Sequence, residues 1–427
     1  MEESTKPEIW KYTLINGQKN TIEVLNPKID KGVLTSIEDA RPIIKKDKDG
    51  NKVDPTVEFV EFEKRKIYRE FFKKPFKNFL VLTGAGSSMD VEGKSMFQLW
   101  DIAEKKYHYE NTEESGLKSD LKTICETIKF EYERKDLEAL LSQIEGTIKF
   151  SGDTEIELNG DVKKELSVIK AEIFKVIVDE CTIPTPPIDS FPHKTFLEKI
   201  LQRKQTSPRV KIFTLNYDTL FEDAARAANS IVIDGFSFTL PRTFSGRFFD
   251  YDIVQREGSK LKEEDNFIQR VLHLHKLHGS INWTRKDSTN EVIVESNPSE
   301  PLMVYPRESK YEDSYEQPFF EMMARFQRNL RLNNDTLLIC IGYSFNDKHI
   351  NAAIEEALNQ NPGFRLAVID PGFDNSQVKA MQSIKSQALK SERIIMVAET
   401  FSEFANSFPE IQTYESTSPD VINLRNE

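Results

Sequence analysis

The fold is decided by the stretch Asn78-Phe79-Leu80-Val81-Leu82-Thr83-Gly84-Ala85-Gly86-Ser87-Ser88. Its first five residues are a short apolar run, which predicts a buried strand, and the glycines predict a tight turn directly after it. Residues with helical spacing follow at Met96, Leu99 and Trp100. A strand, a glycine turn and a helix in this order are typical of the opening of a nucleotide-binding α/β domain.

The same kind of short apolar run returns along the chain at residues 210–214, 336–341, 365–369 and 394–397. Continuous apolar runs that alternate with helical segments predict a parallel sheet covered on both faces. The sequence therefore predicts an α/β fold built on a doubly wound, mostly parallel, Rossmann-like sheet.

Three regions depart from this pattern. We expect an N-terminal appendage over residues 1–75, with a hairpin around Asn16-Gly17 and a helix, and a polar tail over residues 411–427. Within the main domain of residues 76–410, three stripes with helical spacing begin at Leu121, Leu137 and Val162 and predict a helical insertion at about residues 102–205. The stripes predict packed core faces rather than cofactor-binding surfaces.

Composition and charge exclude several classes of protein. A formal net charge of −12 argues against a protein that grips nucleic acid non-specifically. The N-terminus lacks the basic start and apolar run of a signal peptide, and no apolar stretch approaches the ~20 residues of a membrane span. Three widely separated cysteines cannot form a disulfide framework and favour a reduced, cytoplasmic setting: Cys125, Cys181 and Cys340.

Motifs rich in glycine or polar residues follow the predicted strands. In Gly84-Ala85-Gly86-Ser87 the glycines would let backbone N–H groups approach a phosphate. A tight structural turn explains this motif about as well, because it is neither a complete G-x-G-x-x-G nor a Walker A sequence. In Thr214-Leu215-Asn216-Tyr217-Asp218, Asn216 and Asp218 stand where doubly wound sheets bind ligands. A helix cap is the favoured local explanation of these two residues.

A third motif, His273-Leu274-His275-Lys276-Leu277-His278-Gly279, is rich in histidine. No cysteine or carboxylate stands at ligand spacing, so a zinc site is disfavoured. His273 and His275 alternate along a strand and are predicted to be structural. His278 stands at the strand end and is the better candidate for a general base.

A fourth motif, Gly342-Tyr343-Ser344-Phe345, is another glycine turn at a predicted strand end. Asp370 follows the next strand. It either accepts a hydrogen bond from a ribose hydroxyl or caps the turn at Pro371-Gly372.

In this order the four motifs resemble the sirtuins, and within them the sirtuin-like NADases of bacterial antiphage defence. The resemblance covers about residues 77–399. It implies that Asn216 binds the nicotinamide ribose and positions water, that Asp218 contacts the nicotinamide side, and that His278 is the general base. The other candidate NAD-binding residues are Gly84, Ala85, Gly86 and Ser87 at the pyrophosphate, Gly342 and Ser344 at the adenosine ribose, and Thr214 and Asp370.

The sequence also departs from the protein-deacylating sirtuins. Those enzymes carry a zinc module with two cysteine pairs after the His-Gly turn, whereas residues 284–290 here form a short polar turn without cysteine. The glycine loop also lacks their Pro-Asp-Phe-Arg continuation. The resemblance therefore implies an NAD glycohydrolase without zinc, which converts NAD to ADP-ribose and nicotinamide and depletes cellular NAD in abortive infection. The alternatives are an NAD-dependent protein deacylase or ADP-ribosyltransferase, and a non-catalytic sensor of NAD or ADP-ribose.

An NADase must be gated, because unregulated activity would kill its own host. The length of the chain leaves no room for a second ligand-sensing domain. We therefore expect a homo-oligomer and a separate partner such as a HerA-type ATPase, with no membrane and no direct nucleic-acid contact. The N-terminal hairpin is a candidate contact, and its packing on its own domain is an equal alternative.

Overall fold

The computed structural model describes residues 13–30, 33–41, 45–53, 55–110, 117–159, 162–204, 207–255, 267–303, 317–332 and 335–410. The predicted polar tail lies outside the described residues. In the described part of the chain, no helix is long and apolar enough to cross a membrane.

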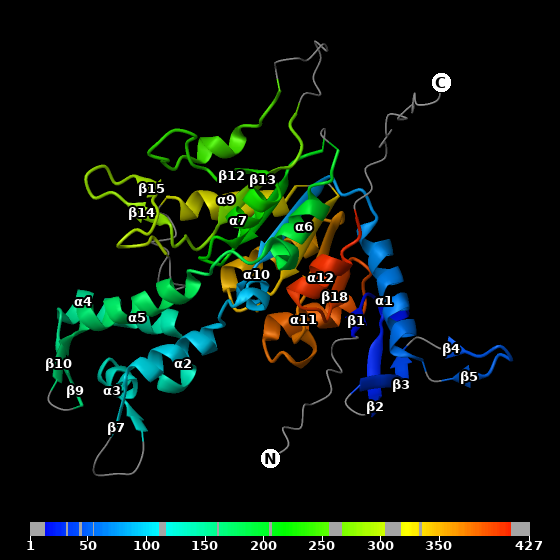
Figure 1. The fold of residues 1–427 in the computed structure, drawn as a ribbon, viewed down its shortest axis with the longest axis horizontal. Helices are drawn as coiled ribbons and strands as arrows, with labels where there is room; N and C mark the ends of the chain where they lie inside the picture. Colours follow the sequence, from blue (N-terminus) through cyan, green and yellow to red (C-terminus); the bar gives the residue numbers. More distant parts are fainter. Residues whose placement is uncertain are drawn as a thin grey trace, which may run out of the picture.

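A central sheet of eight strands organises the molecule, in the order β1-β18-β17-β16-β6-β11-β13-β12 (Figure 1). Every neighbouring pair is parallel except β1 with β18. The predicted fold class is confirmed, and all five predicted strands are present. The strands are β1 (Leu14–Ile15), β6 (Asn78–Thr83), β11 (Val210–Thr214), β12 (Ile231–Ile233), β13 (Val271–Lys276), β16 (Thr336–Ile341), β17 (Phe364–Ile369) and β18 (Ile394–Val397).

Helices cover both faces of this sheet, which explains why its strands are continuous apolar runs. Along β6, Phe79 and Val81 pack on one face, while Leu80 and Leu82 pack on the other. The first face is covered by α1 (Val57–Phe72), α6 (Pro192–Ile200), α7 (Leu220–Ala227) and α12 (Phe401–Ser407). The second is covered by α9 (Phe319–Leu330), α10 (Lys348–Gln360) and α11 (Lys379–Ala388).

Residues 96–181 form a lobe beside the sheet with a hydrophobic core of its own (Figure 1), whereas α6, also within the predicted insertion, packs on the sheet. The lobe contains α2 (Met96–Lys106), α3 (Asp120–Thr127), α4 (Leu137–Ser151) and α5 (Leu166–Cys181), with the hairpins β7 (His108–Glu110) to β8 (Leu117–Ser119) and β9 (Glu155–Leu158) to β10 (Val162–Glu165). The buried residues of α3, α4 and α5 are the predicted core stripes. Val162 is the exception, because it lies on β10 and its side chain is 49 % exposed.

The N-terminal segment adds strands and a helix at one edge of the sheet. The chain reverses at Asn16-Gly17, and Leu14 and Ile22 exchange backbone hydrogen bonds at 3.0 and 2.7 Å. Strand β1 also pairs with β18, where Asn16 Nδ2 donates to the carbonyl of Ile394 at 2.8 Å. The predicted reversal therefore packs on the protein's own sheet. The hairpins β2 (Glu23–Asp30) to β3 (Val33–Arg41) and β4 (Lys45–Lys46) to β5 (Lys52–Val53) follow it.

Candidate functional site

The order of the strands places two glycine loops against each other. The chain passes from β6 to β11 on one side, and β16 lies on the other side of β6. This is the point where the strand order reverses, and ligands of doubly wound sheets bind at the carboxyl ends of strands at such a point. The loops of residues 84–88 and 342–347 meet there. The candidate site is therefore the carboxyl edge of β6, β11, β13 and β16.

The glycines of the two loops are needed because the backbones touch. Gly342 has a φ of 56°, and a Cβ on it would lie 2.4 Å from the Gly86 Cα and from the Ser87 nitrogen. The Gly86 N–H donates to the Gly342 carbonyl at 3.0 Å. Of the two explanations left open by the sequence, close packing of the loops is what the structure shows.

Most backbone N–H groups of the first loop already donate within the protein. Those of Gly84 and Gly86 donate to residues 341 and 342, and those of Ser87 and Ser88 donate to residues 84 and 85. A pyrophosphate at this loop would need other donors or a local rearrangement. Phosphate binding by residues 84–87 therefore stays a prediction.

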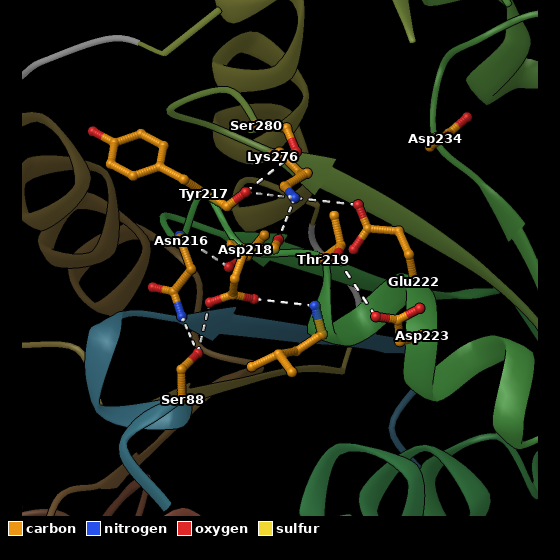
Figure 2. Close-up of polar contacts among 12 residues, drawn as sticks. Ser88, Asn216, Tyr217, Asp218, Thr219, Glu222, Asp223, Asp234, Lys276 and Ser280 are labelled. Atoms are coloured by element: carbon orange, nitrogen blue, oxygen red, sulfur yellow. Dashed lines mark hydrogen bonds and ion pairs between the residues drawn. The ribbon is translucent and has the colours of Figure 1, made fainter. Parts of the chain in front are cut away.

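Asn216 lies directly over this loop, as the sequence predicts for a residue at the end of β11. Its Nδ2 donates to the Ser87 hydroxyl at 3.1 Å and to the Ser88 hydroxyl at 3.0 Å. Figure 2 shows the bond to Ser88. Its backbone N–H donates to the buried hydroxyl of Thr214 at 3.1 Å, so Thr214 supports the turn. The half-buried side chain is held by the hydrogen bonds of its amide nitrogen.

Asp218 uses its two carboxylate oxygens within the protein. Oδ2 accepts from the Ser88 hydroxyl at 2.8 Å, and Oδ1 accepts from the Leu220 N–H at 3.1 Å at the start of α7. Burial raises the pKa of Asp218, and the buried ammonium of Lys276 opposes that rise. The helix-cap explanation therefore accounts for this residue, and its contact with nicotinamide stays a prediction.

A buried lysine, which the sequence analysis did not select, fixes the turn between Asn216 and α7. The Lys276 ammonium is 2 % exposed and donates to the carbonyls of Tyr217 and Asp218 and to Glu222 Oε1 at 3.2 Å (Figure 2). Lys276 lies within the histidine-rich motif, whose histidines are the more obvious candidates for chemistry. We call Ser87, Ser88, Asn216, Asp218 and Lys276 the Asn216 cluster.

His278 stands at the end of β13 and faces a carboxylate from another strand end. Its Nε2 lies 3.5 Å from Asp347 Oδ2. Asp347 is fixed in turn, because its Oδ1 accepts the His349 and Ile350 N–H groups at 2.9 and 3.0 Å and caps α10. Burial opposes ionisation of Asp347, but His278 and the two N–H groups outweigh it and hold its pKa below the ordinary value.

A second carboxyl group reaches this place from the helical insertion. Glu138, in the first turn of α4, accepts a hydrogen bond from the Tyr217 hydroxyl at 2.7 Å. Burial raises the pKa of Glu138 to about 7, and the charge of His278 opposes that rise. No motif in the sequence indicates Glu138, since it lies in a stripe typical of a helix core. We call Glu138, His278 and Asp347 the His278 cluster.

With this geometry in hand, the chain can be compared with known proteins. Residues 210–394 match the model of a family described as SIR2-like domain. The matched range contains Asn216, Asp218, His278, Gly342 and Ser344, and the glycine loop after β6 precedes it. The resemblance of residues 210–394 to a SIR2-like domain is confirmed. The antiphage subfamily and the HerA-type partner stay predictions.

Comparison with other proteins adds little to this match. A solved structure described as "Sir2 bound to acetylated peptide" is similar over 78 % of this chain and 91 % of that chain, at 13 % identity and a TM-score of 0.33. That likeness is too distant to carry an argument about function. No curated protein matches the chain.

Two other histidines of the SIR2-like segment are structural, as predicted. His275 lies between the rings of Phe213 and Phe249, with ring centroids 4.4 and 4.1 Å away and nearly parallel planes. Burial lowers the pKa of His275 and, to about 4, that of His273. Both rings are therefore neutral parts of the packed second face.

The adenosine side of the predicted site lies along β16 and β17. Ser344 is exposed on the loop after β16, where a ligand can reach it. Asp370 Oδ1 accepts from the Gly372 N–H at 2.6 Å, so Asp370 caps its turn. Its contact with a ribose stays a prediction.

The region of the deacylase zinc module is occupied here by a short hairpin of β14 (Trp283–Arg285) and β15 (Val292–Val294). The three free cysteines lie elsewhere, in α3, at the end of α5 and in β16. In the ranges that the structure describes, no three His, Cys, Asp or Glu side chains form a group able to hold a metal ion.

Two cavities lie away from this edge. One is lined by basic residues that include Arg203, Arg209 and Arg270 at the opposite edge of the sheet, and the other lies between α10 and α11. Neither contains residues of the Asn216 or His278 clusters. The convergence of polar side chains at strand ends, rather than cavity size, therefore identifies the candidate site.

Proposed function

We propose that the carboxyl edge of the sheet binds NAD and hydrolyses it to ADP-ribose and nicotinamide. The observation that carries this proposal is the placement of Asn216 and His278 at the ends of the adjacent strands β11 and β13, beside the glycine loop. The SIR2-like match supports it, because members of such families are NAD-dependent enzymes.

The residues suit each step of this reaction. The bond between ribose C1′ and the nicotinamide nitrogen breaks, its electron pair goes to that nitrogen, and nicotinamide leaves as a neutral molecule. Water then attacks the positive ribose carbon and loses a proton. His278 is the base that takes this proton, and Asn216 Oδ1 is the acceptor that orients the water or a ribose hydroxyl.

A product assay separates this activity from the alternatives. The purified chain is incubated with NAD, with and without an acetyl-lysine peptide and a candidate HerA-type ATPase, and products are separated by chromatography. We expect equal amounts of nicotinamide and ADP-ribose, whether or not the peptide is present. Release of nicotinamide that requires the peptide would show a deacylase. Bound NAD that is never cleaved, with or without the ATPase, would show a sensor.

The biological setting is a separate part of the proposal. Depletion of NAD during phage infection, a homo-oligomer and a HerA-type partner rest on the sequence resemblance alone. Light scattering of the purified protein, alone and with the ATPase, would test the oligomer and the partner. Phage-infection assays on cells that carry the active or the His278→Ala protein would test the defence role. Equal phage yield from both kinds of cell would contradict the defence role.

A further inference from the structure

His278 lies among carboxylates that come from outside its own strand. Asp347 belongs to the loop between β16 and α10, and Glu138 belongs to α4 of the helical insertion. The proposed hydrolysis needs a base in a defined orientation and protonation state. Neither carboxylate has a role in the predicted site.

Asp347 is held in a position from which it can orient the His278 imidazole. Two backbone N–H groups hold its Oδ1, so its Oδ2 is fixed 3.5 Å from His278 Nε2. An acceptor at Nε2 favours the tautomer with the proton on that nitrogen. The lone pair of Nδ1 then remains to accept the proton from water. The same carboxylate stabilises the imidazolium that this transfer creates.

Glu138 connects the insertion to the loop that follows His278. Its partner Tyr217 has a ring buried in the hydrophobic core of the insertion. The Tyr217 carbonyl accepts from the Ile281 N–H at 3.1 Å and from the Ser280 hydroxyl at 3.3 Å. Tyr217 therefore joins α4, the Asn216 turn and the residues that follow His278.

We propose that Asp347 and Glu138 are positioning residues for His278, so that the helical insertion completes the catalytic centre through Glu138. This inference rests on the proposed function for the chemistry that His278 performs. It makes the insertion a control point, because any movement of α4 relative to the sheet changes the surroundings of the base.

The charges around the base set the sign of the expected effects. His278 faces Asp347 from the loop before α10, and Glu138 in α4 interacts with it electrostatically. Asp136 at the start of α4 adds a further negative charge near Glu138. Tyr217 and Asp218 are the titratable groups on the turn after β11. Negative charge favours the imidazolium, so removal of either carboxylate should favour the neutral ring.

Two substitutions remove charge while they preserve local structure. Asp347→Asn keeps an N-cap of equal quality, because asparagine caps helices as well as aspartate does. Glu138→Gln keeps an acceptor for the Tyr217 hydroxyl, whereas Glu138→Ala removes it. Asp252→Asn is the control for net charge, since Asp252 pairs with Arg209, which lines the cavity at the opposite edge of the sheet.

The first measurement does not depend on activity. Histidine-labelled protein is titrated by NMR, and the His278 signal is assigned by its loss in His278→Gln. We expect the titration midpoint of His278 to fall by about 1 pH unit in Asp347→Asn and by less in Glu138→Gln, with no change in Asp252→Asn. Midpoints that stay at the wild-type value in both variants, with folded protein, would overturn the proposal.

The second measurement is the pH profile of NAD hydrolysis. We expect kcat to fall ~10-fold or more in Asp347→Asn, with KM little changed and the acidic limb shifted to lower pH. Glu138→Gln should retain more activity than Glu138→Ala. If the His278 midpoint shifts in the variants but the wild-type protein never cleaves NAD, the proposed function is refuted and the positioning role stands. Normal cleavage with unshifted profiles and midpoints would refute the positioning alone.

Discussion

The Asn216 cluster and the His278 cluster lie at one sheet edge but are built differently. In the Asn216 cluster, each side chain is bonded to another part of the same packed loops, and Lys276 ties the turn from below. In the His278 cluster, the side chains come from β13, α10 and α4, and His278 and Asp347 are 17 % exposed. The first cluster resembles a packed core, and the second resembles an interface between two lobes.

This difference separates the residues that hold the fold from those that we propose perform the chemistry. Changes in the packed loops should act first on the free energy of unfolding. Changes in the His278 cluster should act on NAD turnover, because few hydrogen bonds of the sheet depend on it. The predictions below test this separation, beginning with the largest effect on stability.

Gly342→Ala should damage the packed loops most. The new methyl group would meet backbone atoms at 2.4 Å and would also hold the residue at a positive φ. We expect a loss on the order of 4 kcal/mol in the free energy of unfolding, measured with urea. Gly50→Ala is the matched control, with a φ of 86° and nothing within 4 Å of the added atom, and should cost about 1 kcal/mol. Equal losses in the two variants would show that the loops are not tightly packed.

Lys276→Met should destabilise the turn between Asn216 and α7. It removes the donor of the Tyr217 and Asp218 carbonyls and leaves Glu222 without its cation. We expect about 3 kcal/mol of destabilisation in urea unfolding. Lys286→Met, which removes a cation from the exposed pair with Glu295, should cost less than about 0.5 kcal/mol. A Lys276→Met protein as stable as the Lys286→Met control would contradict the anchoring role.

His193→Leu should show how much of the pH dependence of the free energy of unfolding comes from the packed layers rather than from the polar edge of the sheet. His193 is fully buried with its ring 4.9 Å from those of Phe221 and Phe401, and burial lowers its pKa to about 3. Below pH 6.5 the His193 side chain binds a proton in the unfolded chain but not in the folded protein. The free energy of unfolding therefore decreases as the pH is lowered. This residue should account for about 2 kcal/mol lost between pH 7 and pH 5. Urea unfolding at both pH values should show that much less loss in His193→Leu, and an identical pH dependence would argue against a buried neutral ring.

Much of the first cluster could be predicted from sequence, and little of the second. Asn216 and His278 follow apolar runs directly, and parallel strands bring their carboxyl ends to one edge whatever lies between them. Glu138 is 79 residues away from Tyr217 in sequence, and nothing in the stripe around it indicates which way the insertion turns. Asp347 stands two residues after the motif Gly342-Tyr343-Ser344-Phe345, but a helix cap and a partner for histidine have the same local sequence.

The pairing of the edge strands with the sheet was not predicted either, although the reversal at Asn16-Gly17 was. Strand β1 has two residues and β12 has three, too short for an alternating pattern to stand out. Val162 fits the helical spacing of α5, yet it pairs with Leu158 in β10 because the helix begins only at Leu166. Such boundaries depend on tertiary contacts that local spacing does not contain.

The central proposal is that Asn216 and His278 belong to one NAD-hydrolysing centre. Initial rates of nicotinamide release by Asn216→Ala, His278→Ala and the double variant test it most directly. When two groups act together in one step, removing both lowers kcat little more than removing one of them does. We predict that each single variant loses ~10²–10⁴-fold in kcat and remains folded in the absence of urea, with Asn216→Ala the less stable of the two because it loses the hydrogen bonds to Ser87 and Ser88. We also predict that the double variant is no slower than the slower single variant. Wild-type rates in either single variant, or losses that multiply in the double variant, would contradict a single centre built from the two clusters.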